Sequence, residues 1–294
     1  CIGLQFYLLN MHSTAVLSGL KHAKITLYSA IIVSISNVVF SLFFGLFLGY
    51  GASGIGFASS VAFLIASIYS VTVLKKQQSH LNVSYEDVDK ASMKKKFFSV
   101  GSYIVIRSLF LTLFFAYIRN RAALMSMDEI ALQHILLQLW SVGYIFVDAV
   151  AIAAQTLIAE LISKKEKYQN SLLQKELISV TTIISLILSV IPLIFLESFI
   201  EIFTGDRFDL FVDFRLKVMV SISLLIGCFA FLWDGVLLGL DKSKEFSLLS
   251  ILSATAGFLI CSYLLMYQNT IEILWVSINV SLTVRAVLGY LYQK

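Results

Sequence analysis

The stretch GCFAFLWDGVLLGLDKSK, residues 227–244, is an apolar run that carries the acid Asp234 near its middle and ends in a basic turn. A charged side chain among Phe, Leu and Trp is costly to desolvate, so it must be paired or must face water inside the protein. The same run is half of an internal repeat, because residues 16–24 (VLSGLKHAK) match residues 236–244 (VLLGLDKSK) at an offset of 220. The acid and the repeat guide the interpretation of the whole chain.

The composition is that of a membrane protein. Of the 294 residues, 59% are hydrophobic and 14% are charged, and the mean hydropathy is +0.88. Soluble domains are about 45–50% apolar and about 25% charged, which leaves enough polar surface to cover a core. Whole runs of about 20 residues are apolar on every face, which excludes a transmembrane barrel and predicts an all-α polytopic membrane protein.

Nine apolar segments are long enough to span a bilayer. They cover residues 1–20, 25–48, 52–74, 97–118, 129–162, 172–203, 213–240, 245–267 and 270–292. Lysines gather in alternate loops and at the C-terminus, with Arg119 and Arg121 as exceptions. The positive-inside rule therefore predicts cytoplasmic basic loops and a cytoplasmic C-terminus.

The repeat predicts the organisation of the chain. At the offset of 220, segments 25–48 and 52–74 fall on 245–267 and 270–292 without a gap. Parallel repeats of this kind build transporters from two similar bundles. We expect residues 1–74 to be the last three helices of a first bundle, 75–96 a cytoplasmic connector, and 97–294 a complete six-helix bundle. On this argument the chain is about nine helices of a twelve-helix protein.

Five stretches together resemble the DinF branch of the multidrug and toxic compound extrusion (MATE) transporters. The resemblance covers nearly the whole chain and depends on the order and spacing of its features: an early Arg, an acid before an Ala-rich run, an Asp-Gly pair and a Leu-Trp. The stretches are 36–62 (SNVVFSLFFGLFLGYGASGIGFASSVA), 101–123 (GSYIVIRSLFLTLFFAYIRNRAA), 128–160 (DEIALQHILLQLWSVGYIFVDAVAIAAQTLIAE), 231–246 (FLWDGVLLGLDKSKEF) and 273–287 (ILWVSINVSLTVRAV).

The resemblance implies two six-helix bundles that face a central cavity, and export of small organic, often cationic compounds in exchange for H⁺ or Na⁺. It implies a monomer in the bacterial inner membrane, with lipids as neighbours and no cofactor besides the coupling ion. The branch often has Asn followed four residues later by Asp in the fifth helix, whereas this chain has Asn37 and Ser41. The first bundle therefore has a serine where that pattern has its acid.

Arg107, Asp148 and Asp234 are the ionisable residues that we select within the spans of the second bundle. An isolated charge at the bilayer centre costs about 2.5–3.5 kcal/mol even on a lenient scale, so mutual pairing is expected. Two acids and one base would leave a net negative site for a proton, a sodium ion or a cationic substrate. The alternative is a buried salt bridge that only joins helices.

Polar and aromatic neighbours are further candidates. Gln138 lies nearly three turns before Asp148 on one face and is a candidate member of the site. Tyr103, Tyr144 and Trp140 could stack on flat cations, although aromatic residues more often belong to a core or a lipid belt. Asn37 is either a cation ligand or a hydrogen bond between helices.

The sequence offers no support for catalysis. It contains no GxSxG, HExxH or CxxC pattern, and its four histidines are scattered, so we expect neither an enzyme nor a metal centre. The net charge of +4 does not indicate a nucleic-acid partner. The alternatives to a drug exporter are a lipid-linked oligosaccharide flippase of the same superfamily and a membrane receptor or scaffold. A single intramembrane Arg argues against a flippase, and the repeat argues against a scaffold.

Overall fold

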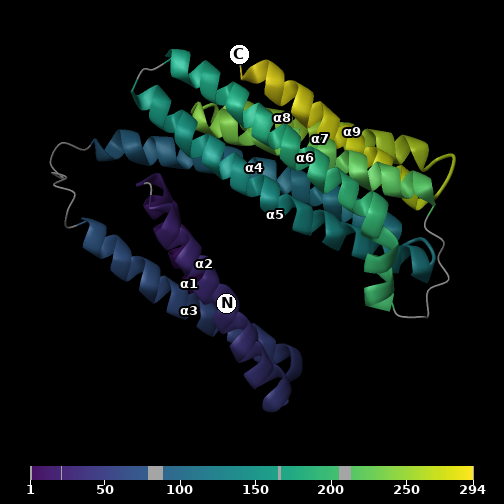
Figure 1. The fold of residues 1–294 in the computed structure, drawn as a ribbon, viewed down its shortest axis with the longest axis horizontal. Helices are drawn as coiled ribbons and strands as arrows, with labels where there is room; N and C mark the ends of the chain where they lie inside the picture. Colours follow the sequence, from purple (N-terminus) through teal and green to yellow (C-terminus); the bar gives the residue numbers. More distant parts are fainter. Residues whose placement is uncertain (1, 21, 79–88, 165–166, 205–212, 294) are drawn as a thin grey trace. The chain divides into compact units, whose positions relative to one another are not determined.

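The computed structural model describes residues 2–20, 22–78, 89–164, 167–204 and 213–293, and these residues are helical apart from short turns (Figure 1). The helices are α1 (Ile2–Gly19), α2 (Ala23–Phe40), the π-helical η1 (Ser41–Phe47), α3 (Gly51–Gln78), α4 (Lys90–Ala122), α5 (Met127–Ser163), α6 (Lys167–Thr204), α7 (Phe214–Gly239), α8 (Ser243–Leu264) and α9 (Ile271–Tyr292).

Each apolar segment predicted from the sequence coincides with a helix over most of its described residues. Within the described residues, eight helical segments are long and apolar enough to cross a membrane, with η1 counted as the continuation of α2. The exception is α1, whose 18 residues include Gln5, Asn10 and His12. Large apolar side chains are exposed along α4 and α6, as expected for surfaces that contact lipid tails instead of water.

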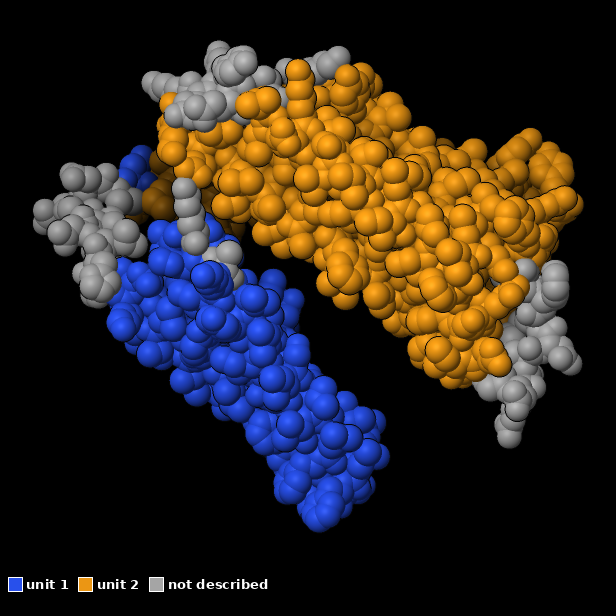
Figure 2. Space-filling model, in the orientation of Figure 1, with its two compact units in different colours: residues 1–89 blue, residues 90–294 orange. Residues whose placement is uncertain are grey.

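The chain separates into two compact units, residues 1–89 and 90–294 (Figure 2). In the first unit α3 packs against both α1 and α2. The carboxamide oxygen of Asn10 in α1 accepts hydrogen bonds from Ser29 in α2 at 2.9 Å and from Ser70 in α3 at 3.0 Å. This buried contact joins all three helices. Gly49 and Gly51 adopt φ values of +70° and +53°, which explains the glycines in the turn before α3.

The second unit is built around α7, which packs against α5, α6 and α9, while α8 packs against α4 and α9. Its core contains the fully buried Trp275, Leu136 and Ile118. Gly235 and Gly239 allow α7 to approach α5 closely. A Cβ on Gly235 would lie 2.2 Å from the carbonyl oxygen of Ala151, and one on Gly239 would lie 2.9 Å from that of Gln155. These two glycines give α7 a narrow face that packs directly against the backbone of α5.

The internal repeat corresponds to matching helix boundaries. The last residues of α1 and α7, the first of α2 and α8, and the first of α3 and α9 are each 220 positions apart. The packing also corresponds, because α9 contacts α7 and α8 as α3 contacts α1 and α2. One difference is local. The first unit has the π-helical η1, whereas the corresponding residues 261–267 of the second unit are the end of α8 and a turn, and Gly54 approaches the carbonyl of Phe44 beside η1.

The predicted connector at 75–96 is shorter in the described structure. Helix α3 continues to Gln78, and α4 already begins at Lys90. The basic residues Lys94 and Lys96 therefore lie on the first turns of a long helix instead of in a loop. Charged residues at the end of a spanning helix can extend it beyond the apolar core, which hydropathy alone does not detect. Residues 79–88 of the connector lie outside the described residues.

Candidate functional site

A cluster of three charged side chains, of which Asp234 and Arg285 are buried, joins α4, α7 and α9. Arg285 of α9 donates to the Asp234 carboxylate of α7 through two nitrogens, from Nε to Oδ1 at 3.2 Å and from Nη2 to Oδ2. Arg107 of α4 donates from Nη2 to Oδ2 at 3.1 Å. The side chains of Asp234 and Arg285 are 8% and 5% exposed, and that of Arg107 is 18% exposed. Asp234 is thus paired, as its position in an apolar run requires.

Both guanidinium groups have further contacts. Arg107 Nε donates to Ser250 Oγ of α8 at 3.1 Å, which brings a fourth helix to the cluster. Arg107 lies 4.3 Å from the ring centre of Phe246, and Arg285 lies 4.8 Å from that of Phe231. An arginine above an aromatic face keeps a favourable electrostatic contact after it loses water. These contacts hold both arginines in place.

The two arginines line a cavity of about 370 Å³ within the second unit. Its walls come from α4, α5, α7 and α9 and are mostly aromatic or aliphatic. The lining residues are Arg107, Leu111, Phe114, Phe115, Trp140, Ser141, Tyr144, Phe231, Ile278, Ser281, Leu282 and Arg285. The set contains two basic side chains and no acidic one. A volume of this size is within the range of cavities that hold small organic ligands.

Four aromatic rings form a continuous series along this cavity. The ring centres of Phe115 and Trp140 are 5.5 Å apart, those of Trp140 and Tyr144 are 3.8 Å apart, and those of Tyr144 and Phe231 are 4.4 Å apart. Two polar atoms in the series, Trp140 Nε1 and Tyr144 Oη, are buried and have no hydrogen-bond partner in the described structure. Such atoms are rare in folded proteins because each costs free energy, so they point to a ligand or a rearrangement.

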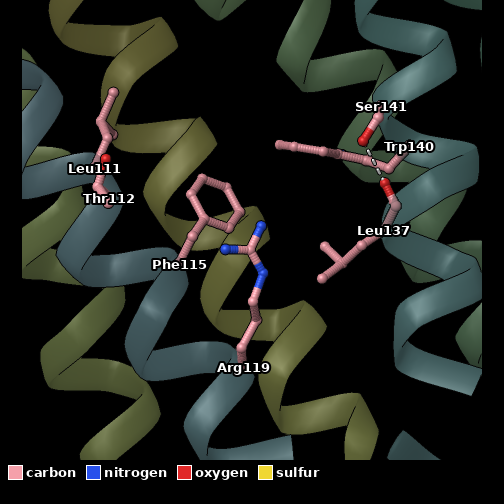
Figure 3. Close-up of a pocket in the computed structure, with 7 residues that line it drawn as sticks. All are labelled: Leu111, Thr112, Phe115, Arg119, Leu137, Trp140 and Ser141. Atoms are coloured by element: carbon pink, nitrogen blue, oxygen red, sulfur yellow. Dashed lines mark hydrogen bonds between the residues drawn. The ribbon is translucent and has the colours of Figure 1, made fainter. Parts of the chain in front are cut away.

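A second cavity of about 260 Å³ adjoins the first and shares Leu111, Phe115, Trp140 and Ser141 with it. Figure 3 shows Phe115 and Arg119 of α4 facing Leu137 and Trp140 of α5 across this space. Arg119 is the charged residue of its lining. The two cavities together extend the space between α4 and α5 from the buried cluster towards the end of α4.

Of the other site residues predicted in the second unit, only Trp140 and Tyr144 line a cavity beside the cluster. Asp148 is exposed, one turn beyond Tyr144 on α5, and it attracts both guanidinium groups through space without forming an ion pair with either. Gln138 is exposed and lines neither cavity, and Tyr103 is half-buried one turn before Arg107 and also lines neither. Trp140 and Tyr144 line the first cavity, as the stacking hypothesis requires.

Asn37 belongs to the first unit. Its Nδ2 donates to Ser59 Oγ of α3 at 3.1 Å, and its Oδ1 accepts from Ser41 Oγ at 3.0 Å. The side chain therefore links α2 to α3, which corresponds to the helix-to-helix alternative. Within the described part of the chain, no group of three or more His, Cys, Asp or Glu residues could hold a metal ion.

Arg285 is the residue that sequence reasoning missed. It lies in the last predicted span, so the same rule that selected Arg107 should have selected it. Its inclusion changes the charge balance, because Asp234 is shared by two bases and the cluster with Asp148 carries two positive and two negative charges. The expected net negative site was wrong. The argument against a flippase from a single intramembrane Arg was also wrong.

Comparisons with known proteins agree with this architecture. No protein-family model matches the chain. Two curated proteins of Arabidopsis thaliana are similar in sequence. Protein DETOXIFICATION 44, chloroplastic, is 24% identical over 274 residues, or 92% of this chain and 51% of that protein. Protein DETOXIFICATION 42 is 20% identical over 289 residues, or 98% of this chain and 55% of that protein. The chain thus spans about half the length of these relatives.

Solved structures show the same fold. A MATE transporter crystallised in complex with MaL6 superposes with a TM-score of 0.86 at 14% identity, covering 98% of this chain and 66% of that one. A MOP superfamily transporter from Pyrococcus furiosus, described as having a binding pocket of reverse polarity, superposes with a TM-score of 0.88 at 15% identity, covering 99% of this chain and 66% of that one. The chain is therefore a multi-pass integral membrane protein that has the fold of the MATE transporters and is similar in sequence to two DETOXIFICATION proteins.

Proposed function

We propose that this chain acts in a secondary active transporter that exports drugs or other xenobiotic organic compounds by alternating access, in exchange for H⁺ or Na⁺. The observation that carries the proposal is the buried Asp234 carboxylate, shared by Arg107 and Arg285 at the wall of a cavity. Charged residues inside a membrane are costly and mark substrate or ion pathways in many transporters. The chain's relatives and its fold support the same class of protein.

The cluster can connect ion binding to helix movement. The carboxylate of Asp234 holds α4 and α9 to α7, and Arg107 also reaches Ser250 of α8. A proton or sodium ion that binds Asp234 competes with the guanidinium groups and weakens their hydrogen bonds to the carboxylate. Release of the ion restores them. A coupling ion thereby favours one arrangement of the helices over the other, which is the requirement for a shift between two states.

The experiment is substrate uptake into everted membrane vesicles that contain the full natural protein. A fluorescent organic dye is supplied under an imposed H⁺ or Na⁺ gradient, and its accumulation is followed with time. Asp234→Asn should abolish gradient-driven uptake. Asp128→Asn removes the same charge from an exposed position at the start of α5 and should leave uptake unchanged. Gradient-driven uptake that is equal in both variants and the wild type would overturn the proposed mechanism.

A lipid-linked oligosaccharide flippase is the second candidate, and Arg285 is the observation that favours it. Three arginines, at 107, 119 and 285, line the two adjoining cavities, and such groups suit a pyrophosphate. A flippase would translocate a fluorescent lipid-linked oligosaccharide in proteoliposomes without taking up dye. A receptor or scaffold would show neither activity, so the two assays separate all three functions.

A further inference from the structure

We infer that the cavity of the second unit is a binding site for a small organic anion with an aromatic body and a carboxylate group. This inference deepens the proposed function, because it names the substrate class of the transporter, and it rests on that function for its biological meaning. The binding site itself can be tested without transport.

The charge of the lining favours an anion. Arg107 and Arg285 line the cavity, whereas Asp234 lies behind them with both carboxylate oxygens accepting hydrogen bonds from guanidinium groups. A cation in this space would meet two like charges, with the nearest carboxylate already occupied. Asp148 attracts both guanidinium groups from an exposed position on α5, but it is not part of the lining. An anion would meet the positive groups directly.

Arg107 is the group best placed to hold the carboxylate. A guanidinium has five N–H donors, and within the described structure Arg107 uses one for Ser250 and one for Asp234. None of its nitrogen atoms is among the fully buried atoms that lack a hydrogen-bond partner, so its remaining donors are accessible. Its side chain is the most exposed of the cluster, at 18%. Arg285 instead gives two nitrogens to Asp234 and is almost fully buried. A ligand that enters the cavity therefore meets spare donors on Arg107.

The unpartnered donors and the rings match the rest of such a ligand. Tyr144 is nine-tenths buried, and its hydroxyl has no hydrogen-bond partner in the described structure. The indole N–H of Trp140 also has none. A carboxylate accepts several hydrogen bonds, so one ligand group could satisfy more than one of these donors. The ring series from Phe115 to Phe231 offers flat apolar walls, on which an aromatic body can stack. An aliphatic polyanion would leave these walls without a matching surface.

The test is equilibrium dialysis of the purified full-length protein with three probes that share the naphthalene ring and are of similar size. The probes are 2-naphthoate, the neutral 2-naphthamide and the cationic 2-naphthylmethylammonium. We expect naphthoate to bind at least tenfold more tightly than either of the others. Equal binding of all three, or preference for the cation, would overturn the inference.

Substitutions at two lining positions, Arg107 and Ser141, assign the binding to this cavity. Arg107→Gln should weaken naphthoate at least tenfold, Arg107→Lys should weaken it less, and Arg215→Gln, which removes an exposed arginine at the start of α7, should have no effect. Ser141→Asp adds a carboxylate to an exposed lining position and should lower the preference for naphthoate over the cation. Naphthoate binding that is unchanged in both Arg107→Gln and Ser141→Asp would place the site elsewhere and overturn the inference.

The dialysis result separates this inference from the proposed function. Selective naphthoate binding without any gradient-driven flux would support the anion site and contradict the transporter. Gradient-driven export of cationic dyes, together with no preference for naphthoate, would support the transporter and contradict the anion site.

Discussion

Arg285 donates hydrogen bonds from two nitrogens to the carboxylate of Asp234, across the interface between α9 and α7. Both side chains are almost completely buried, so neither charge has water as an alternative partner. The planar fork of an arginine matches the two oxygens of a carboxylate, which fixes the rotation of both side chains as well as their distance. The position of Asp234 beside the cavity therefore depends on α9 as much as on α7.

The first prediction concerns the loss of one partner from this pair. Arg285→Met leaves Asp234 with Arg107 alone and should lower the free energy of unfolding by about 3 kcal/mol, near the lower end of the range for a broken buried pair. The double variant Arg285→Met with Asp234→Leu should recover at least half of that loss, since no buried carboxylate remains. Unfolding of the detergent-solubilised protein measures both. A single variant as stable as the wild type would show that the pair is unimportant for folding.

The second prediction concerns the contact between α7 and α5. Gly235→Val would place carbon atoms against the carbonyl of Ala151, where even a Cβ would lie at 2.2 Å, so the two helices must separate. We expect a destabilisation of about 1–3 kcal/mol, typical of overpacking. Gly101→Val is the matched control, because a Cβ there meets nothing within 4 Å. Thermal denaturation of the two variants should differ clearly, and an equal effect would contradict the close approach.

The third prediction concerns a buried hydrogen bond between α9 and α5. Trp275 Nε1 donates to Gln133 Oε1 at 2.9 Å, and both side chains are buried. Trp275→Phe leaves the Gln133 carboxamide without this partner and should cost about 1–3 kcal/mol. Adding Gln133→Leu removes the orphaned amide, whose Nε2 already lacks a partner, and should restore part of the stability. A double variant less stable than Trp275→Phe would contradict this account.

The fourth prediction concerns the turn from α7 to α8. Asp241 has a φ of 61°, a conformation that a β-branched residue adopts only with strain. Asp241→Gly should be neutral or slightly stabilising, whereas Asp241→Val should destabilise by about 1–2 kcal/mol. Both variants lose the exposed ion pair with Lys96. Lys96→Ala, which removes only the ion pair, therefore serves as the control. If Lys96→Ala lost as much stability as Asp241→Val, the effect would come from the ion pair instead of the backbone.

The sequence predicted the helices well because the bilayer imposes a simple rule on length and hydropathy. The repeat around Gly19 and Gly239 correctly indicated corresponding helices, because the ends of α1 and α7 and the starts of α2 and α8 are each 220 residues apart. The pairing of Arg107 with Asp234 followed from the cost of isolated charges. The exposed position of Asp148 could not be deduced, because its face of α5 depends on which neighbours pack there.

The pairing of Arg285 with Asp234 could not be predicted from the sequence. Its segment is apolar enough to span a membrane in spite of the charge, and the identity of its partner depends on the packing of α9 against α7. The aromatic series around Trp140 and Tyr144 likewise joins residues from three helices. Contacts between distant segments depend on how the helices pack. A single sequence therefore identifies candidate site residues but not which of them are in contact.

The proposed mechanism requires Asp234 to exchange its two arginine partners for a coupling ion during transport. The most direct measurement is substrate-induced H⁺ or Na⁺ movement in proteoliposomes of the full natural protein, recorded for the wild type, Asp234→Asn and Asp128→Asn. We expect ion movement on substrate addition in the wild type and in Asp128→Asn, and none in Asp234→Asn. Ion movement of equal size in all three proteins would contradict this mechanism.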